Sequence, residues 1–337
     1  VRSRVPISEI YVKEPTNDIP FNYKQLWDCF SENATVIEYA VKLGIAVGSD
    51  IREHNEYARK NYFYADLPKG YQISQQTRPI CKNGFVKIKL GDGEKKILLN
   101  RIHIEEDAAK LMHEKKISLV DFNKAGVPLI EIVTEPCIRN IEDASTYAQY
   151  IQRIVQNLKI SDANLEKGEF KSDVSVSLRK KGTTGLNPRT EIKNLNSFKF
   201  MVEALKEEVE KQLNYYKEHK EFRPEQTTVL WDADLKQTKT MRKKEFEADY
   251  RFISEPDLPF VAIKEVDVDI IMPHEKVLLD KKDILKNNLK YKDEHIIIST
   301  ILICSKSNMI IDGHHRYTAL KELGYKNIPV TMINYFS

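Results

Sequence analysis

Short β-strands are predicted throughout residues 85 to 195, and so many strands in so short a stretch restrict the fold classes that the chain can adopt. Six segments there have strand character: FVKIKLG (85–91), KKILLNRIHIEE (95–106), SLVDF (118–122), PLIEIVTEP (128–136), SDVSVSLRK (172–180) and TEIKNL (190–195). Helical spacing of apolar residues predicts three helices around them, over 34–47, 140–158 and 196–220. Strands and helices mixed in this order are typical of an α+β domain rich in antiparallel pairing.

The character of the chain changes near residue 262. A chain of 337 residues is longer than one domain usually is, so two hydrophobic cores are expected. After the prolines of EPDLPF (255–260), the remainder predicts strand, helix, strand, turn, helix and strand. We therefore predict a large α+β domain over 1–262 and a small α/β domain over 263–337.

Composition excludes several classes of protein. Fifty-three Lys and Arg oppose 50 Asp and Glu, so any nucleic-acid or phosphate site must come from local clustering. Four widely spaced cysteines, without CxxC or CxxH spacing, argue against a zinc knuckle or a disulfide framework and favour a reducing compartment. No apolar run approaches the roughly 18 to 20 residues that span a bilayer. We expect a soluble protein with no membrane partner, cytoplasmic if bacterial and mitochondrial or plastid if eukaryotic.

Several predicted strands carry carboxylates, which strands normally disfavour. Glu131 lies between Ile130 and Ile132, where a buried carboxylate needs a cation or a donor. Asp173 and Glu191 lie on other strands, and HIEEDA adds further acids at 105–107. Convergent oxygen ligands of this kind suit Mg²⁺. The alternative is that each acid lies on a solvated strand face or pairs with a nearby lysine.

The segment RKNYFYADLPKGYQISQ (59–75) combines aromatic, cationic and amide side chains more densely than a core strand or a plain loop requires. It predicts a recognition surface.

Six segments together resemble the B subunit of the glutamyl/aspartyl-tRNA amidotransferases, the GatB family. They are RKNYFYADLPKGYQISQ (59–75), RIHIEEDAAKLMH (101–113), SLVDFNKAGVPLIEIVTEPCIRNIEDA (118–144), ISDANLEKGEFKSDVSVSLR (160–179), TEIKNLNSFKF (190–200) and EPDLP (255–259). The resemblance covers roughly residues 33 to 262 and implies a cradle-shaped sheet domain. The chain departs from the family pattern over residues 1–32, where family members carry a strand that supplies a Glu and a His to the metal site.

The resemblance also implies a reaction and its participants. Glu or Asp mischarged on tRNA(Gln) or tRNA(Asn) is phosphorylated by ATP with Mg²⁺ and then amidated. The ammonia comes from a separate amidase subunit (GatA-like), which acts together with a GatC-like subunit. The implied metal ligands are Glu106, Glu131 and Glu191, with Asp173 in a supporting catalytic role. The residues implied to hold phosphate or substrate are Arg59, Lys60, Lys69, Gln72, Ser74 and Gln75.

The last segment, NMIIDGHHRYTALKELGYKNIPVTMINY, predicts a strand, an Asp-Gly turn and a helix that begins at about His314. Free amides at a helix N-terminus favour anions, so the turn predicts a phosphate site, the alternative being an ordinary solvated turn. The domain resembles the ParB/sulfiredoxin-like fold and is closest to its free serine kinases. That resemblance implies Glu275 as general base, with Asp312, His314, His315 and Arg316 handling phosphate.

Two functions other than the amidotransferase stay open. The chain could be a non-catalytic adaptor that binds partner subunits or tRNA ends, or a phosphotransferase that acts only through its C-terminal domain.

Overall fold

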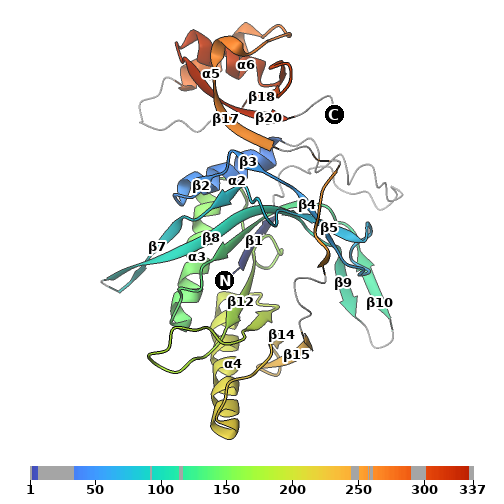
Figure 1. Cartoon of the computed structure of the whole chain (residues 1–337), viewed down its shortest axis with the longest axis vertical. Coiled ribbons are helices and arrows are strands. Elements are labelled where there is room, and N and C mark those ends of the chain that lie inside the picture. The colour runs from blue at the N-terminus through green and yellow to red at the C-terminus, as the bar shows by residue number, and fades with distance from the viewer. Residues whose placement is uncertain are drawn as a thin grey trace.

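The chain folds into two parts with separate hydrophobic cores. The computed structural model describes residues 2–6, 34–91, 93–113, 117–243, 250–256, 258, 261–289 and 301–333. One cluster of buried apolar side chains lies between Val36 and Leu258, and a second lies between Val268 and Val330. Figure 1 shows the second part above the first. Most of the atypical segment 1–32 lies outside the described residues.

A ten-stranded sheet forms the centre of the first part. Its order is β15-β14-β13-β12-β1-β11-β8-β6-β2, and β7 pairs with β8 beside this path. The strands are β1 (Arg2–Pro6), β2 (Asp50–Ile51), β6 (Cys81–Lys82), β7 (Phe85–Leu90), β8 (Gly93–Glu106), β11 (Pro128–Thr134), β12 (Lys171–Val176), β13 (Thr190–Lys193), β14 (Thr227–Asp232) and β15 (Gln237–Lys243). All their pairings are antiparallel except that of β13 with β14, so the predicted α+β class is confirmed.

Helices α2 (Ala34–Ala46), α3 (Ile141–Asn157) and α4 (Phe198–His219) pack against this sheet. Alternate residues of β8 and β11, such as Ile104 and Ile130, are fully buried in the same cluster as Tyr147 of α3. Because side chains alternate between the faces of a strand, the residues next to these isoleucines along each strand point to the other face of the sheet. That face carries His103 and Glu105 of β8 and Glu131 of β11.

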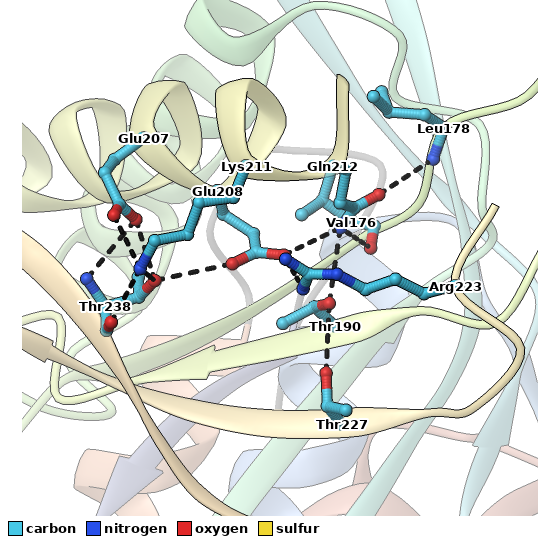
Figure 2. A network of polar contacts seen from close by, with 10 residues as sticks. All are labelled: Val176, Leu178, Thr190, Glu207, Glu208, Lys211, Gln212, Arg223, Thr227 and Thr238. Atoms are coloured by element: carbon cyan, nitrogen blue, oxygen red, sulfur yellow. Dashed lines mark hydrogen bonds and ion pairs between the residues drawn. The ribbon is translucent and has the colours of Figure 1, made fainter. Parts of the chain in front are cut away.

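Helix α4 is fixed to the sheet by a buried polar network (Figure 2). Glu208 is fully buried and accepts hydrogen bonds from Gln212 (3.0 Å), Arg223 (2.9 Å) and Thr238 (3.4 Å). Gln212 also donates to Thr190 of β13 (3.2 Å). The helix is therefore joined to two separate strands by side-chain contacts.

Two smaller sheets flank the large one. Strands β4 (Ala58–Asn61), β5 (Tyr71–Ser74) and β16 (Ile253–Ser254) form a sheet in the order β16-β4-β5, and β9 (Lys110–His113) and β10 (Ser118–Asp121) form a hairpin. The predicted recognition segment 59–75 is thus the β4–β5 hairpin. It lies at one end of β8 (Figure 1).

The second part is a five-stranded sheet with two helices. Its order is β19-β18-β20-β17-β3, with β18 and β20 parallel. The elements are β3 (His54–Asn55), β17 (Val261–Asp267), a 3₁₀ turn (Val268–Ile270), α5 (Leu279–Leu289), β18 (Ile301–Cys304), β19 (Ile310–Asp312), α6 (His314–Glu322) and β20 (Asn327–Ile333). Strand β3 comes from the first part, and the predicted boundary at 262/263 lies inside β17. Across the described ranges, no helix has the length and apolar composition needed to cross a membrane.

Candidate functional site

Three ligand-type side chains converge on the polar face of β8 and β11. His103 and Glu131 are register partners on the two strands, and Glu105 lies two residues beyond His103 on the same face. One donor atom from each of the three lies within 4.8 Å of the others, and the side chains are 2%, 6% and 3% exposed for His103, Glu105 and Glu131. We call these three residues the acid cluster.

The geometry of the acid cluster fits a divalent cation. His103 Nε2 and Glu105 Oε1 contact each other at 3.1 Å, a hydrogen-bond distance. Two ligands at right angles around an ion at about 2.1 Å would lie a similar distance apart, about 3 Å. The second ring nitrogen, His103 Nδ1, is buried with no hydrogen-bond partner among the described residues. Ser74 Oγ donates to the same Glu105 oxygen (2.8 Å) and fixes its orientation.

The expected ligand set Glu106, Glu131 and Glu191 is not the group that the structure forms. Glu106 follows Glu105 by one residue, so it points away from the acid cluster, toward Lys69 (2.7 Å) and the Ile73 amide (2.8 Å). Glu191 lies on β13, three strands from β11, and three strand spacings amount to about 14 Å. Of the three predicted ligands, Glu131 alone belongs to the acid cluster.

Burial raises the pKa of Glu106, while the ammonium group of Lys69 and the Ile73 amide oppose that rise. Asp173, the predicted supporting acid, lies on β12 with its Oδ2 atom 3.8 Å from Lys193 Nζ. Glu106 and Asp173 therefore each have a lysine neighbour. This arrangement agrees with the alternative prediction, in which single acids pair with nearby lysines and bind no metal.

The predicted substrate-binding residues of the β4–β5 hairpin divide into two groups. Gln72 and Gln75 are 9% and 0% exposed and hydrogen-bond to Glu106 O (2.7 Å) and to the Ile104 amide (3.1 Å), respectively. These side-chain amides thus bind the backbone of β8, and their expected contact with substrate stays a prediction. Ser74 is likewise buried, against Glu105.

The cationic residues of the hairpin lie nearer its surface. Arg59 forms a two-pronged ion pair with Glu255 (2.7 and 2.8 Å) and stacks on Tyr71 (4.4 Å). Lys60 Nζ lies 4.5 Å from the centroid of the Tyr250 ring. Their predicted role in holding phosphate stays a prediction.

An aromatic surface extends from the same hairpin. Tyr62 makes edge contacts with Tyr64 (5.9 Å) and Tyr250 (5.7 Å). Phe63 is 93% exposed and Tyr64 is 48% exposed. We call Tyr62, Phe63, Tyr64 and Tyr250 the aromatic edge, and the predicted recognition by this surface stays a prediction.

Comparison with known proteins places this arrangement in a family. Residues 31–269 match the family model described as the GatB/GatE catalytic domain. The chain belongs to the GatB/GatE family. The B subunit of the aspartyl/glutamyl-tRNA(Asn/Gln) amidotransferase from Pelodictyon phaeoclathratiforme is 48% identical over 246 residues, which cover 71% of this chain and 50% of that protein. The B subunits of the same enzyme from Variovorax paradoxus and Chlorobium luteolum are each 49% identical over 69% of this chain. The chain spans about half the length of the curated relatives that it matches.

The GatB/GatE match ends within the 3₁₀ turn, so the predicted phosphate turn of the second part lies beyond it. His314 is 5% exposed and lies 3.3 Å from His274 and 3.4 Å from the carboxylate of Glu275. His315 Nε2 accepts a hydrogen bond from the Leu278 amide (3.0 Å). The structure thus brings Glu275 and His314 together, and their predicted roles stay predictions.

The remaining two residues of the phosphate turn pair with each other. Arg316 donates to the carboxylate of Asp312, one turn before it. Gly313 between them has a φ of 104°, and a Cβ there would lie 3.1 Å from the Arg316 side chain. Gly313 thus suits both the left-handed backbone and the close approach of the guanidinium.

The expected ligand set included Glu106 but neither His103 nor Glu105, the two residues that join Glu131 in the acid cluster. The two-residue period of RIHIEE supplied the needed signal, because it places His103 and Glu105 on one face and Glu106 on the other.

Proposed function

We propose that this chain activates the side-chain carboxylate of Glu or Asp carried on tRNA, as part of an amidotransferase. The acid cluster carries the proposal: three buried ligand groups on adjacent strands of a domain whose relatives are named as amidotransferase subunits. The γ-phosphoryl group of ATP would move to a carboxylate oxygen with ADP leaving, and ammonia would then attack the acyl carbon and displace phosphate.

The acid cluster would hold one Mg²⁺. A bound cation neutralises phosphate charge during phosphoryl transfer. Ser74 contributes by holding Glu105 in one orientation, and burial of the acid cluster keeps water away from it. The mixed nitrogen and oxygen ligand set also suits Mn²⁺, which makes that ion a useful probe.

The partners proposed are an amidase subunit, a GatC-like subunit and a mischarged tRNA. Ammonium chloride can replace the amidase as the ammonia source, which separates this chain's step from its partner's. The assay follows ATP-dependent conversion of Glu-tRNA(Gln) to Gln-tRNA(Gln) by the full chain with 1 mM Mg²⁺. We expect slow conversion that Glu131→Gln abolishes and Glu94→Gln leaves intact, since Glu94 is an exposed carboxylate at the opposite end of β8.

Two outcomes of that assay favour other functions. Binding of tRNA without phosphate release would favour the non-catalytic adaptor. Conversion that is equal in Glu131→Gln and in the unmodified chain would contradict the assignment of the reaction to the acid cluster.

The aromatic edge is proposed to stack the unpaired 3′ end of the tRNA. Exposed rings beside cations are the usual platform for single-stranded nucleic acid, and each stacked base contributes about 1 to 3 kcal/mol. Phe63→Ala should weaken binding of a CCA-ended minihelix at least fivefold. Phe122→Ala, which removes an exposed ring from the β9–β10 connection to β11, should not. Equal affinities of the two variants would contradict this placement.

A second candidate function is phosphotransfer at the C-terminal domain. The contact between Glu275 and His314 at the start of α6 favours it, because it sets a carboxylate beside the proposed phosphate turn. Calorimetric titration of the full chain with ADP and ATP tests it. Arg316→Ala should weaken binding by about 1.5 to 3 kcal/mol, and Glu275→Gln should retain binding but abolish serine phosphorylation. Absence of binding at millimolar nucleotide would make the turn structural.

A further inference from the structure

Strand β17 belongs to both parts of the molecule. It pairs with β20 over six residues, and its first two residues, Val261 and Ala262, pair with Asn55 and His54 of β3. The next amide, that of Ile263, donates to Glu53 O (3.0 Å). The Ile263 side chain packs on the core of the first part, whereas Val266 packs on that of the second. The C-terminal domain is therefore joined to the first part by a continuous sheet.

A buried hydrogen-bond chain leads from this junction to the acid cluster. Asn55 is fully buried, and its side-chain oxygen accepts a hydrogen bond from Gln75 Nε2 (3.0 Å). Gln75 is also fully buried, and its oxygen accepts from the amides of Ile80 (3.2 Å) and Ile104 (3.1 Å). Ile104 lies between His103 and Glu105. The path from β17 to the acid cluster thus passes through two side-chain amides.

The contact with Ile104 occurs where β8 loses a neighbour. The ladder between β6 and β8 ends at Ile102, paired with Cys81. The Ile104 amide is the next donor on that edge, and Gln75 takes the place that a longer β6 would fill. A buried amide without its acceptor costs about 1 to 3 kcal/mol, so Gln75 determines the local position of this edge of β8.

We infer that Gln75 is a positioning residue for the acid cluster, and that the C-terminal domain sets its position through β17 and Asn55. The inference rests on the cation site of the proposed function. Ligands must be held within about 0.5 Å of their working geometry, and Gln75 binds the backbone between two of the three ligands. The C-terminal domain is then a structural part of the site.

Ile263→Pro tests the junction without changing the acid cluster. Proline lacks the amide that donates to Glu53, while its neighbours can still pair with β20. Ile263→Ala is the matched control, because it removes the side chain but keeps the amide. Gln75→Met tests the next link with a side chain of similar volume that cannot form the hydrogen bonds. All variants are made in the full chain, and circular dichroism and thermal unfolding establish that they fold.

The first readout is Mn²⁺ affinity, measured by electron paramagnetic resonance. Loss of a group that orients metal ligands typically weakens binding by about tenfold or more, so we expect about tenfold weaker binding in Gln75→Met and a smaller loss in Ile263→Pro. Ile263→Ala should bind as the unmodified chain does. The second readout is hydrogen exchange, in which the Ile104 amide should lose protection in Gln75→Met and in Ile263→Pro.

The double variant provides the deciding comparison. If β17 acts through Gln75, Ile263→Pro should weaken Mn²⁺ binding no further once Gln75→Met is present. Unchanged Mn²⁺ affinity in both single variants, with normal binding by the unmodified chain, would overturn this inference alone. Failure of the unmodified chain to bind Mn²⁺ would overturn the cation site of the proposed function together with this inference.

Discussion

Two buried acidic clusters in the first part of the molecule use their carboxylates differently. Around Glu208, the carboxylate oxygens accept from Gln212, Arg223 and Thr238, and the neighbouring carboxylate of Glu207 pairs with Lys211 (2.7 Å) (Figure 2). In the acid cluster two carboxylates and an imidazole approach within 4.8 Å of one another. The first arrangement surrounds an acid with donors, whereas the second gathers ligands around one point.

The comparison indicates which of the two buried clusters stabilises the fold. A buried carboxylate is tolerated when donors and an opposite charge meet it, and the network around Glu208 supplies both while joining α4 to the sheet. Gathering the carboxylates of Glu105 and Glu131 at one buried point adds repulsion between them, which a divalent cation relieves. Stability should therefore depend mainly on the first cluster and cation binding on the second.

The largest expected effect is the loss of stability in Arg223→Met. The variant leaves Glu208 buried without its guanidinium partner, and such a loss costs about 3 to 5 kcal/mol. Urea unfolding should show this change, while Mn²⁺ affinity stays as it was. Lys217→Met, on the exposed end of the same helix, is the control and should stay within about 0.5 kcal/mol. A drop in Mn²⁺ affinity with unchanged stability would reverse the roles assigned to the two clusters.

Glu131→Gln should weaken Mn²⁺ binding and leave stability nearly unchanged, which is the opposite of the effect expected for Arg223→Met. The substitution keeps the shape of the side chain and removes one charged ligand, so Mn²⁺ affinity should fall about 100-fold, which equals about 2.7 kcal/mol. Unfolding in the absence of metal should change little or become more favourable to the folded state, because less repulsion remains. Calorimetric titration checks the affinity, and a variant that binds Mn²⁺ normally would exclude Glu131 as a ligand.

Lys69→Met probes the ion pair between Lys69 and Glu106, which is intermediate between the Glu208 network and the acid cluster. Burial already raises the pKa of Glu106, and Lys69 opposes the rise, so removing the lysine should raise the pKa further. We expect a loss of about 2 kcal/mol at pH 8, less than for Arg223 because the Ile73 amide still bonds the carboxylate.

The pH dependence of this loss follows from the raised pKa. A carboxyl whose pKa is raised on folding favours the folded state below its unfolded pKa, and that contribution is lost as pH rises through the folded pKa. The deficit of Lys69→Met should therefore shrink between pH 8 and pH 5. Lys110→Met, an exposed lysine on β9, should show no such trend, and a deficit that is constant with pH would show that Glu106 is not the group responsible.

The secondary structure was largely predictable because short-range periodicity determines it. All six predicted central strands are present, and the helix predicted over 140–158 is α3, with Asn140 as its N-cap. Val36, Ala40 and Leu43 of α2 are buried, whereas Ile45 is 52% exposed, because the position two residues beyond Leu43 lies on the opposite side of the helix. Leu213 of α4 is 44% exposed because it lies beside the buried stripe, which at this height of the helix is occupied by Gln212.

The acid cluster was harder to predict because it depends on strand order. Sequence spacing identified Glu131 as an unusual acid, but it gave no indication that β1 and β12 separate β11 from Glu191 on β13. Likewise, the hydrogen bonds of Gln75 depend on the short β6, whose end leaves the Ile104 amide for a side chain to satisfy. Neither the position of Glu191 nor the hydrogen bonds of Gln75 could be predicted, because one sequence does not specify long-range strand pairing.

The smallest effect concerns His314, which tests whether the C-terminal domain resembles the Glu208 network or the acid cluster. Burial lowers the pKa of His314, as do His274 and His315, whereas Glu275 and Asp312 oppose this. Because a lowered pKa favours the neutral ring in the folded state, stability should be complete above the ordinary value of about 6.5 and decrease as pH falls below it. The change should stay under about 1 kcal/mol, since the two carboxylates partly offset burial. Titration of ¹³C-labelled histidine in the full chain by NMR measures this directly, and Glu275→Gln should lower the pKa of His314 further. A pKa at or above 6.5 would mean that the carboxylates dominate, so that His314 is charged and satisfied by its neighbours in the way that Glu208 is.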